Sequence, residues 1–153
     1  MNWSKGRGKL GLFAPLMGSW TAHADSELGP MTCTRSFESM LGGKYVRLGV
    51  RWEFADGKRK PYEELCLFGV RPDKQTGFWS FTNDGKQSQG WLSSAPDIDA
   101  VAICFEADMD AGRARQVYWP SQTGDGFDWA VESLTKKGWN RFVLHHYVLA
   151  SDV

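Results

Sequence analysis

The chain has 153 residues, about the size of one domain, and can bury a core without disulfide or metal support. Its 18 Lys and Arg residues balance 18 Asp and Glu residues, so the formal net charge is zero. This balance argues against proteins that bind nucleic acids or membrane surfaces, because both classes usually carry excess positive charge. Eight Trp, nine Phe, four Tyr and 17 Gly residues favour β structure with tight turns.

The segment from Leu10 to Leu16 predicts a single helical turn, broken at Pro15. Short apolar and aromatic segments follow, separated by turn signals such as Asp56-Gly57 and Asp84-Gly85. Segment 44–54 alternates between apolar and polar residues, which is typical of a strand. Ten strands are expected over 20–25, 31–40, 44–54, 62–70, 77–82, 86–93, 100–109, 113–119, 127–135 and 140–149.

Sequential antiparallel strands joined by tight turns predict an all-β, up-and-down barrel, because closing the sheet removes its two edges. We expect residues 1–153 to form this one domain of about ten strands. A barrel of this size has room for one small ligand.

Three cysteines, Cys33, Cys66 and Cys104, stand far apart and form no C-x-x-C pair. We expect them to be buried, unbridged side chains in a reducing compartment. The N-terminal apolar stretch is short and interrupted by Gly11 and Pro15, which is unlike a signal peptide. No apolar run approaches the ~20 residues that span a membrane. These features predict a cytoplasmic location and no membrane partner.

A G-x-W motif, Gly18-Ser19-Trp20, follows the predicted helical turn at the start of the first strand. The last strand begins with Trp139-Asn140-Arg141. Together these positions resemble the calycin superfamily, which comprises lipocalins, fatty-acid-binding proteins and related bacterial lipocalin-like families. The resemblance implies a lipocalin-like barrel in which Trp20 closes one end and Arg141 packs across its ring. A planar cation on the negative face of an indole ring is a favourable contact.

Three further segments, 33–38, 42–46 and 78–82, resemble uncharacterised lipocalin-like domains of bacteria. The likeness to fatty-acid-binding proteins and to the haem-binding nitrobindins is more distant. Nitrobindins hold haem through a single His near the end of the barrel. That relationship implies His145 or His146 as an axial ligand if the chain binds haem.

The cluster His145-His146-Tyr147 lies on the last predicted strand. Neighbouring strand residues point to opposite faces, so the two histidines cannot chelate one metal, and no metal site is expected. If Arg141 points inward, the strand period also sends His145 and Tyr147 inward. This arrangement resembles the Arg and Tyr, two residues apart, that hold a carboxylate in fatty-acid-binding proteins.

The other cavity-facing residues are expected to be aromatic, with two inward polar groups. Trp52, Phe105, Phe127 and Trp129 are predicted to form the wall, and Arg51 and Tyr118 to supply the polar groups.

The leading functional hypothesis is the binding of a small, largely hydrophobic molecule inside the barrel, without catalysis and without a cofactor. Haem or another tetrapyrrole, held by His145 or His146, is one alternative. The other is a barrel enzyme that acts on a hydrophobic substrate, with His145, Tyr147 or Glu132 as the acid or base. The stretch from Gly6 to Gly11 matches G-x-G-x-x-G by letter, but no strand precedes it, so no dinucleotide site is expected. Self-association as a homodimer is left open.

Overall fold

The computed structural model describes residues 2–150. In this part of the chain a 3-10 helix, η1 (Gly11–Leu16), precedes ten strands. The strands are β1 (Gly18–Ser26), β2 (Gly29–Met40), β3 (Tyr45–Phe54), β4 (Tyr62–Val70), β5 (Thr76–Thr82), β6 (Gln87–Ser93), β7 (Ile103–Met109), β8 (Gly112–Pro120), β9 (Gly126–Thr135) and β10 (Gly138–Leu149). The predicted all-β class, strand number and short N-terminal turn are confirmed.

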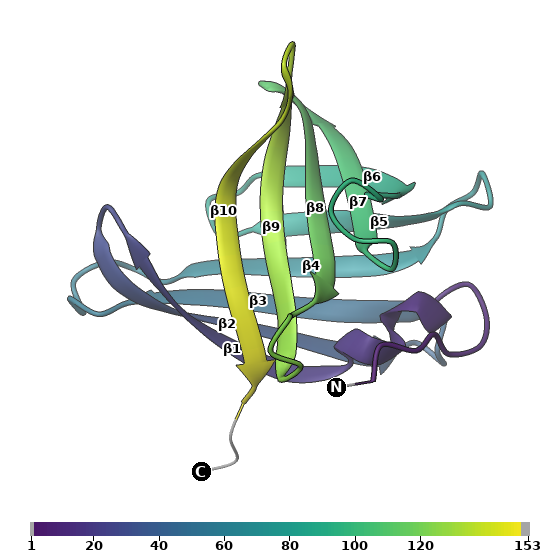
Figure 1. The fold of residues 1–153 in the computed structure, drawn as a ribbon, viewed down its shortest axis with the longest axis horizontal. Helices are drawn as coiled ribbons and strands as arrows, with labels where there is room; N and C mark the ends of the chain where they lie inside the picture. The colour runs from purple at the N-terminus through teal and green to yellow at the C-terminus, as the bar shows by residue number, and fades with distance from the viewer. Residues whose placement is uncertain (1, 151–153) are drawn as a thin grey trace.

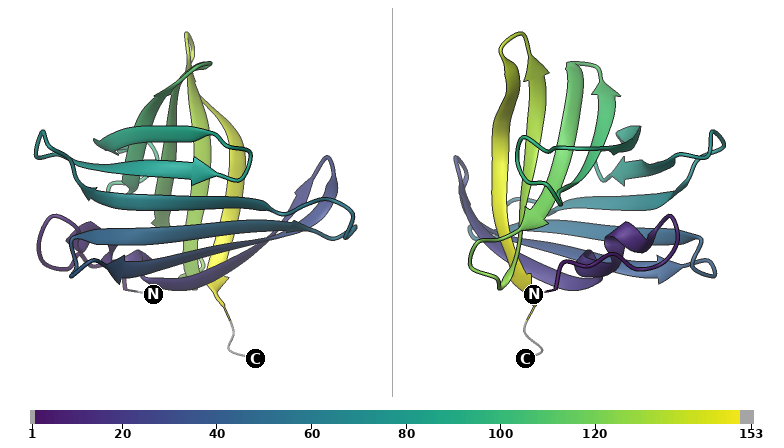
Figure 2. Two further views of the ribbon diagram at one scale, coloured as in Figure 1. Left: turned by 180° about the vertical axis from the view of Figure 1, so that it is seen from behind. Right: turned by 45° about the vertical axis from the view of Figure 1, so that its right-hand side comes forward.

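The strands form a closed barrel in which each one pairs antiparallel with its neighbours in sequence. The barrel closes where β1 pairs with β10, with Trp20 opposite Leu149 and Thr21 opposite Val148. Strands β8, β9 and β10 run across the direction of β3 to β6, so the barrel is flattened into two crossed walls (Figures 1 and 2). Residues that face inward from the two walls fill the space between them.

The alternating sequence pattern determines which side chains enter the barrel. On β3, Val46, Leu48 and Val50 are buried, whereas the intervening residues are more exposed. The strand predicted over 100–109 begins only at Ile103. The preceding residues form turns, because the side chain of Asp99 accepts a hydrogen bond from the backbone N–H of Val101.

One end of the barrel, here called the closed end, is covered by η1. Phe13 and Leu16 are fully buried, and the Phe13 ring lies 4.6 Å from that of Phe68 and 5.8 Å from that of Phe105. Gly18 joins the helix to β1 with a φ of 112°, a conformation that favours glycine. The glycine of the G-x-W motif is therefore required by the turn from η1 into the first strand.

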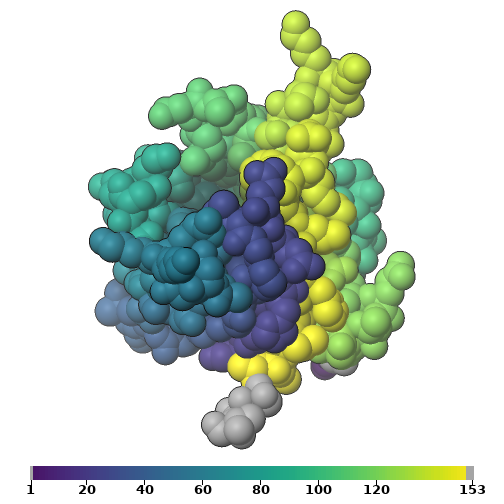
Figure 3. All heavy atoms as spheres, turned by 90° about the vertical axis from the view of Figure 1, so that its left-hand side faces the viewer, coloured from purple at the N-terminus to yellow at the C-terminus, as the bar shows by residue number. Residues whose placement is uncertain are grey.

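The opposite end, here called the open end, carries the connections β1–β2, β3–β4, β5–β6, β7–β8 and β9–β10. Figure 3 shows the molecule from the left-hand side of Figure 1, where several of these connections lie. No helix in the described part of the chain is long and apolar enough to cross a membrane.

The three cysteines are buried and unbridged, as the sequence predicted. Burial raises the pKa of the Cys33 thiol to about 11 and that of the Cys104 thiol to about 12. We therefore expect no reaction of the native protein with Ellman's reagent near pH 8, because the thiolate form is needed for attack. Unfolding the unreduced protein in guanidinium should release three thiols per chain. A count of one would contradict this prediction and indicate a disulfide.

Candidate functional site in the barrel interior

A polar and aromatic cluster occupies the barrel interior, built from β2, β8, β9 and β10. Its centre is Arg35, which is 1% exposed. The guanidinium donates a hydrogen bond to the hydroxyl of Tyr118 at 2.7 Å and lies 4.1 Å from the ring centroid of Trp129. The rings of Tyr118 and Tyr147 lie 5.4 and 5.9 Å from the same group. Arg35 is thus held mainly by ring faces and hydroxyls.

No carboxylate of residues 2–150 lies within ion-pair distance of Arg35, and its Nε has no hydrogen-bond partner in the described chain. Burial opposes the charge of this side chain. Tyr118, Tyr147 and Glu64 counteract that effect, and the pKa of the guanidinium lies above its ordinary value. The barrel therefore encloses a permanent positive charge without a contacting counterion, which is costly unless another group compensates it.

Glu64 is a second charged side chain of the interior. Its carboxylate accepts hydrogen bonds from the hydroxyl of Ser80 at 2.9 Å and from that of Tyr62 at 3.2 Å. Burial is the main cause of the raised pKa of Tyr62, and the neighbouring Glu64 raises this pKa further. Tyr62 therefore stays protonated and can donate a hydrogen bond. Glu64 is thus held on the β4–β5 side of the barrel by neutral groups.

His145 lies in a cage of aromatic rings. Its ring centroid is 5.3 Å from those of Trp52 and Trp129, and its Nδ1 is 3.3 Å from the hydroxyl of Tyr147. Burial, assisted by the charge of Arg35, lowers the pKa of His145 to about 4. The imidazole is therefore neutral near pH 7. Trp52 adds a second buried donor, its Nε1, which interacts with the hydroxyl of Tyr147 but makes no hydrogen bond of ordinary geometry in the described chain.

A cavity of about 360 Å³ opens at the open end, between the β5–β6, β7–β8 and β9–β10 hairpins. Figure 3 shows a hollow between the teal and green hairpins at this end. Its lining is mostly apolar and includes Phe78, Phe105, Ala107, Ala114, Val131 and Phe142. Its floor includes Gln116, whose side-chain oxygen accepts hydrogen bonds from Trp129 Nε1 at 3.2 Å and from Arg35 at 3.4 Å.

A second, much smaller cavity of about 10 Å³ lies deeper in the barrel. It shares Phe78, Phe105 and Gln116 with the open-end cavity and is also lined by Glu64 and Tyr118. Its volume is about that needed for one water molecule. The open-end cavity thus ends at side chains that also contact the charged interior.

Seven of the eight residues predicted to face the cavity do point into the barrel. They are Trp52, Phe105, Tyr118, Phe127, Trp129, His145 and Tyr147, all of which belong to the main core cluster or contact its rings. Only Phe105 among them borders the open-end cavity itself. Their part in ligand binding stays a prediction.

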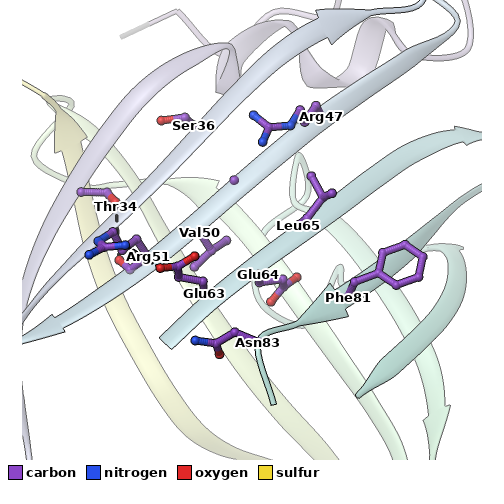
Figure 4. A pocket seen from close by; sticks show the side chains of 11 residues that line it. Thr34, Ser36, Arg47, Val50, Arg51, Glu63, Glu64, Leu65, Phe81 and Asn83 are labelled. Atoms are coloured by element: carbon purple, nitrogen blue, oxygen red, sulfur yellow. Dashed lines mark hydrogen bonds and ion pairs between the residues drawn. The ribbon is translucent and has the colours of Figure 1, made fainter. Parts of the chain in front are cut away.

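The prediction that Arg51 points inward is wrong. Alternation on β3 places it on the outer wall, where it forms ion pairs with Glu53 at 2.5 Å and with Glu63 at 2.6 Å. Figure 4 shows Arg51 beside Thr34 and Glu63 in a shallow concavity of this wall. Trp52, the next residue, points inward on the same strand face as the buried apolar residues of β3.

The prediction that Arg141 packs across the ring of Trp20 is wrong. The register places Trp20 opposite Leu149, eight residues after Arg141 on β10 and therefore about 26 Å further along the strand. Trp20 itself is buried as expected, and donates a hydrogen bond from Nε1 to the carbonyl of Leu16 at 2.7 Å. Its ring packs edge-on against that of Phe127, 4.8 Å away.

A β-bulge between Arg141 and Val143 explains why Arg141 and His145 lie on different faces. The extra residue, Phe142, interrupts the two-residue period, so Arg141 points outward and Val143 inward. Arg141 contacts Glu132 at 2.9 Å and lies 5.1 Å from the ring centroid of Trp119.

The remaining candidates for haem ligation or catalysis are on the outer face. His146 lies between Asp125 and Asp128, at 3.1 and 2.8 Å. Glu132 is almost buried on the outer wall, between Arg115 at 2.7 Å and Arg141 at 2.9 Å. The barrel wall therefore separates Glu132 from His145 and Tyr147, so these three residues do not form one catalytic group.

Three interior polar residues, Arg35, Glu64 and Gln116, were not predicted from the sequence. A signal for the first was present, because Arg35 shares the strand face of Cys33 and Phe37, both of which are buried. A charged residue on an otherwise apolar strand face is unusual and points to a function.

No family model matches the chain. No curated protein matches it either. Among solved structures, the chain is similar to a de novo designed fluorescence-activating β-barrel, with a TM-score of 0.41 and 19% sequence identity over 66% of this chain and 88% of the designed one. The ten-strand antiparallel architecture itself follows from the strand pairing of the present chain.

Proposed function

We propose that the protein is a lipocalin-like binding protein that takes a small, largely apolar molecule into its barrel through the open end. The observation that carries this proposal is the cavity of about 360 Å³, with its largely apolar lining and its single amide at the floor. Its volume falls within the range of small-molecule sites, and its composition is typical of them.

The geometry favours this function over the alternatives of haem binding and catalysis. His145 does not border the open-end cavity and is enclosed by Trp52, Trp129 and Tyr147. It would have to leave this cage to reach a haem iron. His146 faces outward and is held by two carboxylates.

The proposal is tested by titrating the protein with an uncharged apolar dye, N-phenylnaphthylamine, whose fluorescence increases in apolar sites. Ala114 lines the cavity from β8, so Ala114→Trp should fill part of it and weaken dye binding about tenfold or more. Leu144→Trp is the matched control, since Leu144 is exposed on the outer face of β10. If both variants bind the dye equally well, the dye binds outside the open-end cavity. If the wild type does not bind the dye, the proposed function is refuted.

A further inference from the structure

We propose that the ligand carries a carboxylate and that Arg35 binds this group inside the barrel. The inference rests on the proposed function, because it specifies the head group of the molecule that the open-end cavity would hold. Its basis is a fully enclosed guanidinium that contacts rings, the hydroxyls of Tyr118 and Tyr147, and an amide, but no carboxylate of the described residues.

The donors around Arg35 fit a carboxylate. Arg35 Nε has no partner among the described residues, and a guanidinium can present two parallel N–H groups to the two oxygens of one carboxylate. The hydroxyl of Tyr118 contacts the same guanidinium, at 2.7 Å. Trp52 Nε1 is a further buried donor, which interacts with the hydroxyl of Tyr147 but makes no hydrogen bond of ordinary geometry in the described chain. The interior thus has more donors than acceptors, which favours an acceptor-rich ligand group over a hydroxyl or an amine.

The charges that face Arg35 also favour an anion. His145 and both tyrosines of the cluster are neutral near pH 7, so they offer the guanidinium polar contacts and ring faces but no negative charge. Among the described residues, the carboxylate of Glu64 contributes to the charge balance at Arg35, but it is held by Ser80 and Tyr62 instead of pairing with the guanidinium. Glu64 would repel a ligand carboxylate, and this repulsion provides an independent test.

Gln116 lies on the path from the open-end cavity to Arg35. It lines both cavities together with Phe78 and Phe105, and its side-chain oxygen accepts a hydrogen bond from Arg35. That contact is long, at 3.4 Å. A ligand carboxylate would replace this neutral acceptor with a charge-assisted hydrogen bond, which is about twice as strong. The apolar part of the ligand would then remain among the phenylalanines of the cavity.

The experiment compares two fluorescent probes, dansyl-labelled undecanoic acid and its methyl ester. The two probes have the same alkyl chain and differ only in whether the carboxyl group is free or esterified. The wild type should bind the acid about tenfold or more tightly than the ester at pH 7.5. Arg35→Met keeps a long side chain without the charge, and should reduce this preference to about one by weakening acid binding. Arg51→Met, on the exposed outer wall, removes the same charge from the protein as a matched control and should keep the preference.

Glu64→Gln removes the interior carboxylate with almost no change in shape. It should strengthen binding of the acid by several fold and leave binding of the ester unchanged. Near-ultraviolet circular dichroism of the buried tryptophans would show whether Arg35→Met folds. If it does not fold, Glu64→Gln and the comparison of acid and ester binding by the wild type still test whether the interior binds a carboxylate.

The outcomes separate this inference from the proposed function. Equal binding of acid and ester by the wild type, with both displaced by N-phenylnaphthylamine, would overturn the role of Arg35 and leave the apolar site in place. An acid preference that survives in a folded Arg35→Met protein would also overturn it. If neither probe nor the dye binds the wild type, both proposals fail together.

Discussion

Trp20→Ala should lower the free energy of unfolding by about 3–5 kcal/mol, the cost expected for truncating a buried aromatic side chain. Trp20 is 3% exposed, contacts Phe127, and links the first strand to η1 through its bond to the carbonyl of Leu16. The variant loses both the ring contacts and this hydrogen bond, at the end of the barrel that η1 covers. Urea unfolding followed by circular dichroism measures the effect.

The comparison variants separate the two contributions. Trp20→Phe keeps a ring and loses the indole N–H, so its cost should be smaller than that of Trp20→Ala. Because Arg141 lies on the outer face and far along β10 from Trp20, the costs of Trp20→Ala and Arg141→Ala should add. A double variant that is clearly milder than the sum would show that the two side chains are coupled, contrary to the structure.

The fold could be predicted from the sequence because each strand carries its own signal. The alternation on β3 and the turn at Asp84-Gly85 are local features, and they persist in the folded barrel. The beginning of β7 could not be placed as well. There the turn at Asp99 interrupts an apolar segment that continues through Val101 and Ile103.

The site was only partly predictable, because strand register and bulges depend on contacts between distant segments. The prediction for the last strand rested on an unbroken two-residue period from Arg141 to Tyr147. The bulge at Phe142 breaks that period, so His145 and Tyr147 point inward while Arg141 points outward. The inward position of His145 was therefore predicted correctly, but from a premise about Arg141 that the structure corrects.

Arg35 shows how a resemblance can draw attention to the wrong residue. The resemblance to the calycin superfamily predicted an interior arginine on the last strand, whereas the register places Arg35 of β2 directly opposite Trp20 on β1. The strand face that it shares with Cys33 and Phe37 was the more reliable signal, because it depends only on local alternation.

His145 should make the protein sensitive to acid in a pH range that begins well above the ordinary pKa values of carboxylates. Its pKa is about 4 in the folded protein and about 6.5 in an unfolded chain. Above pH 6.5 both states hold a neutral imidazole, so His145 has no effect on the pH dependence. As the pH falls from 6.5 to 4, the unfolded state binds a proton that the folded state does not. The free energy of unfolding should therefore decrease, by about 3 kcal/mol in total from this residue.

His145→Phe keeps a ring between Trp52 and Trp129 and removes the titrating group. Its unfolding free energy, measured in urea at several pH values, should fall much less than that of the wild type between pH 6.5 and 4. Below pH 4 the two proteins should lose stability in parallel, because the carboxyl groups of Asp84, Asp97 and Asp125, whose pKa values are lowered by hydrogen bonds, are common to both. His23→Gln, at an exposed position on the outer face of β1, should keep the acid sensitivity of the wild type. Identical pH profiles for the wild type and His145→Phe would mean that His145 is protonated within its cage of rings.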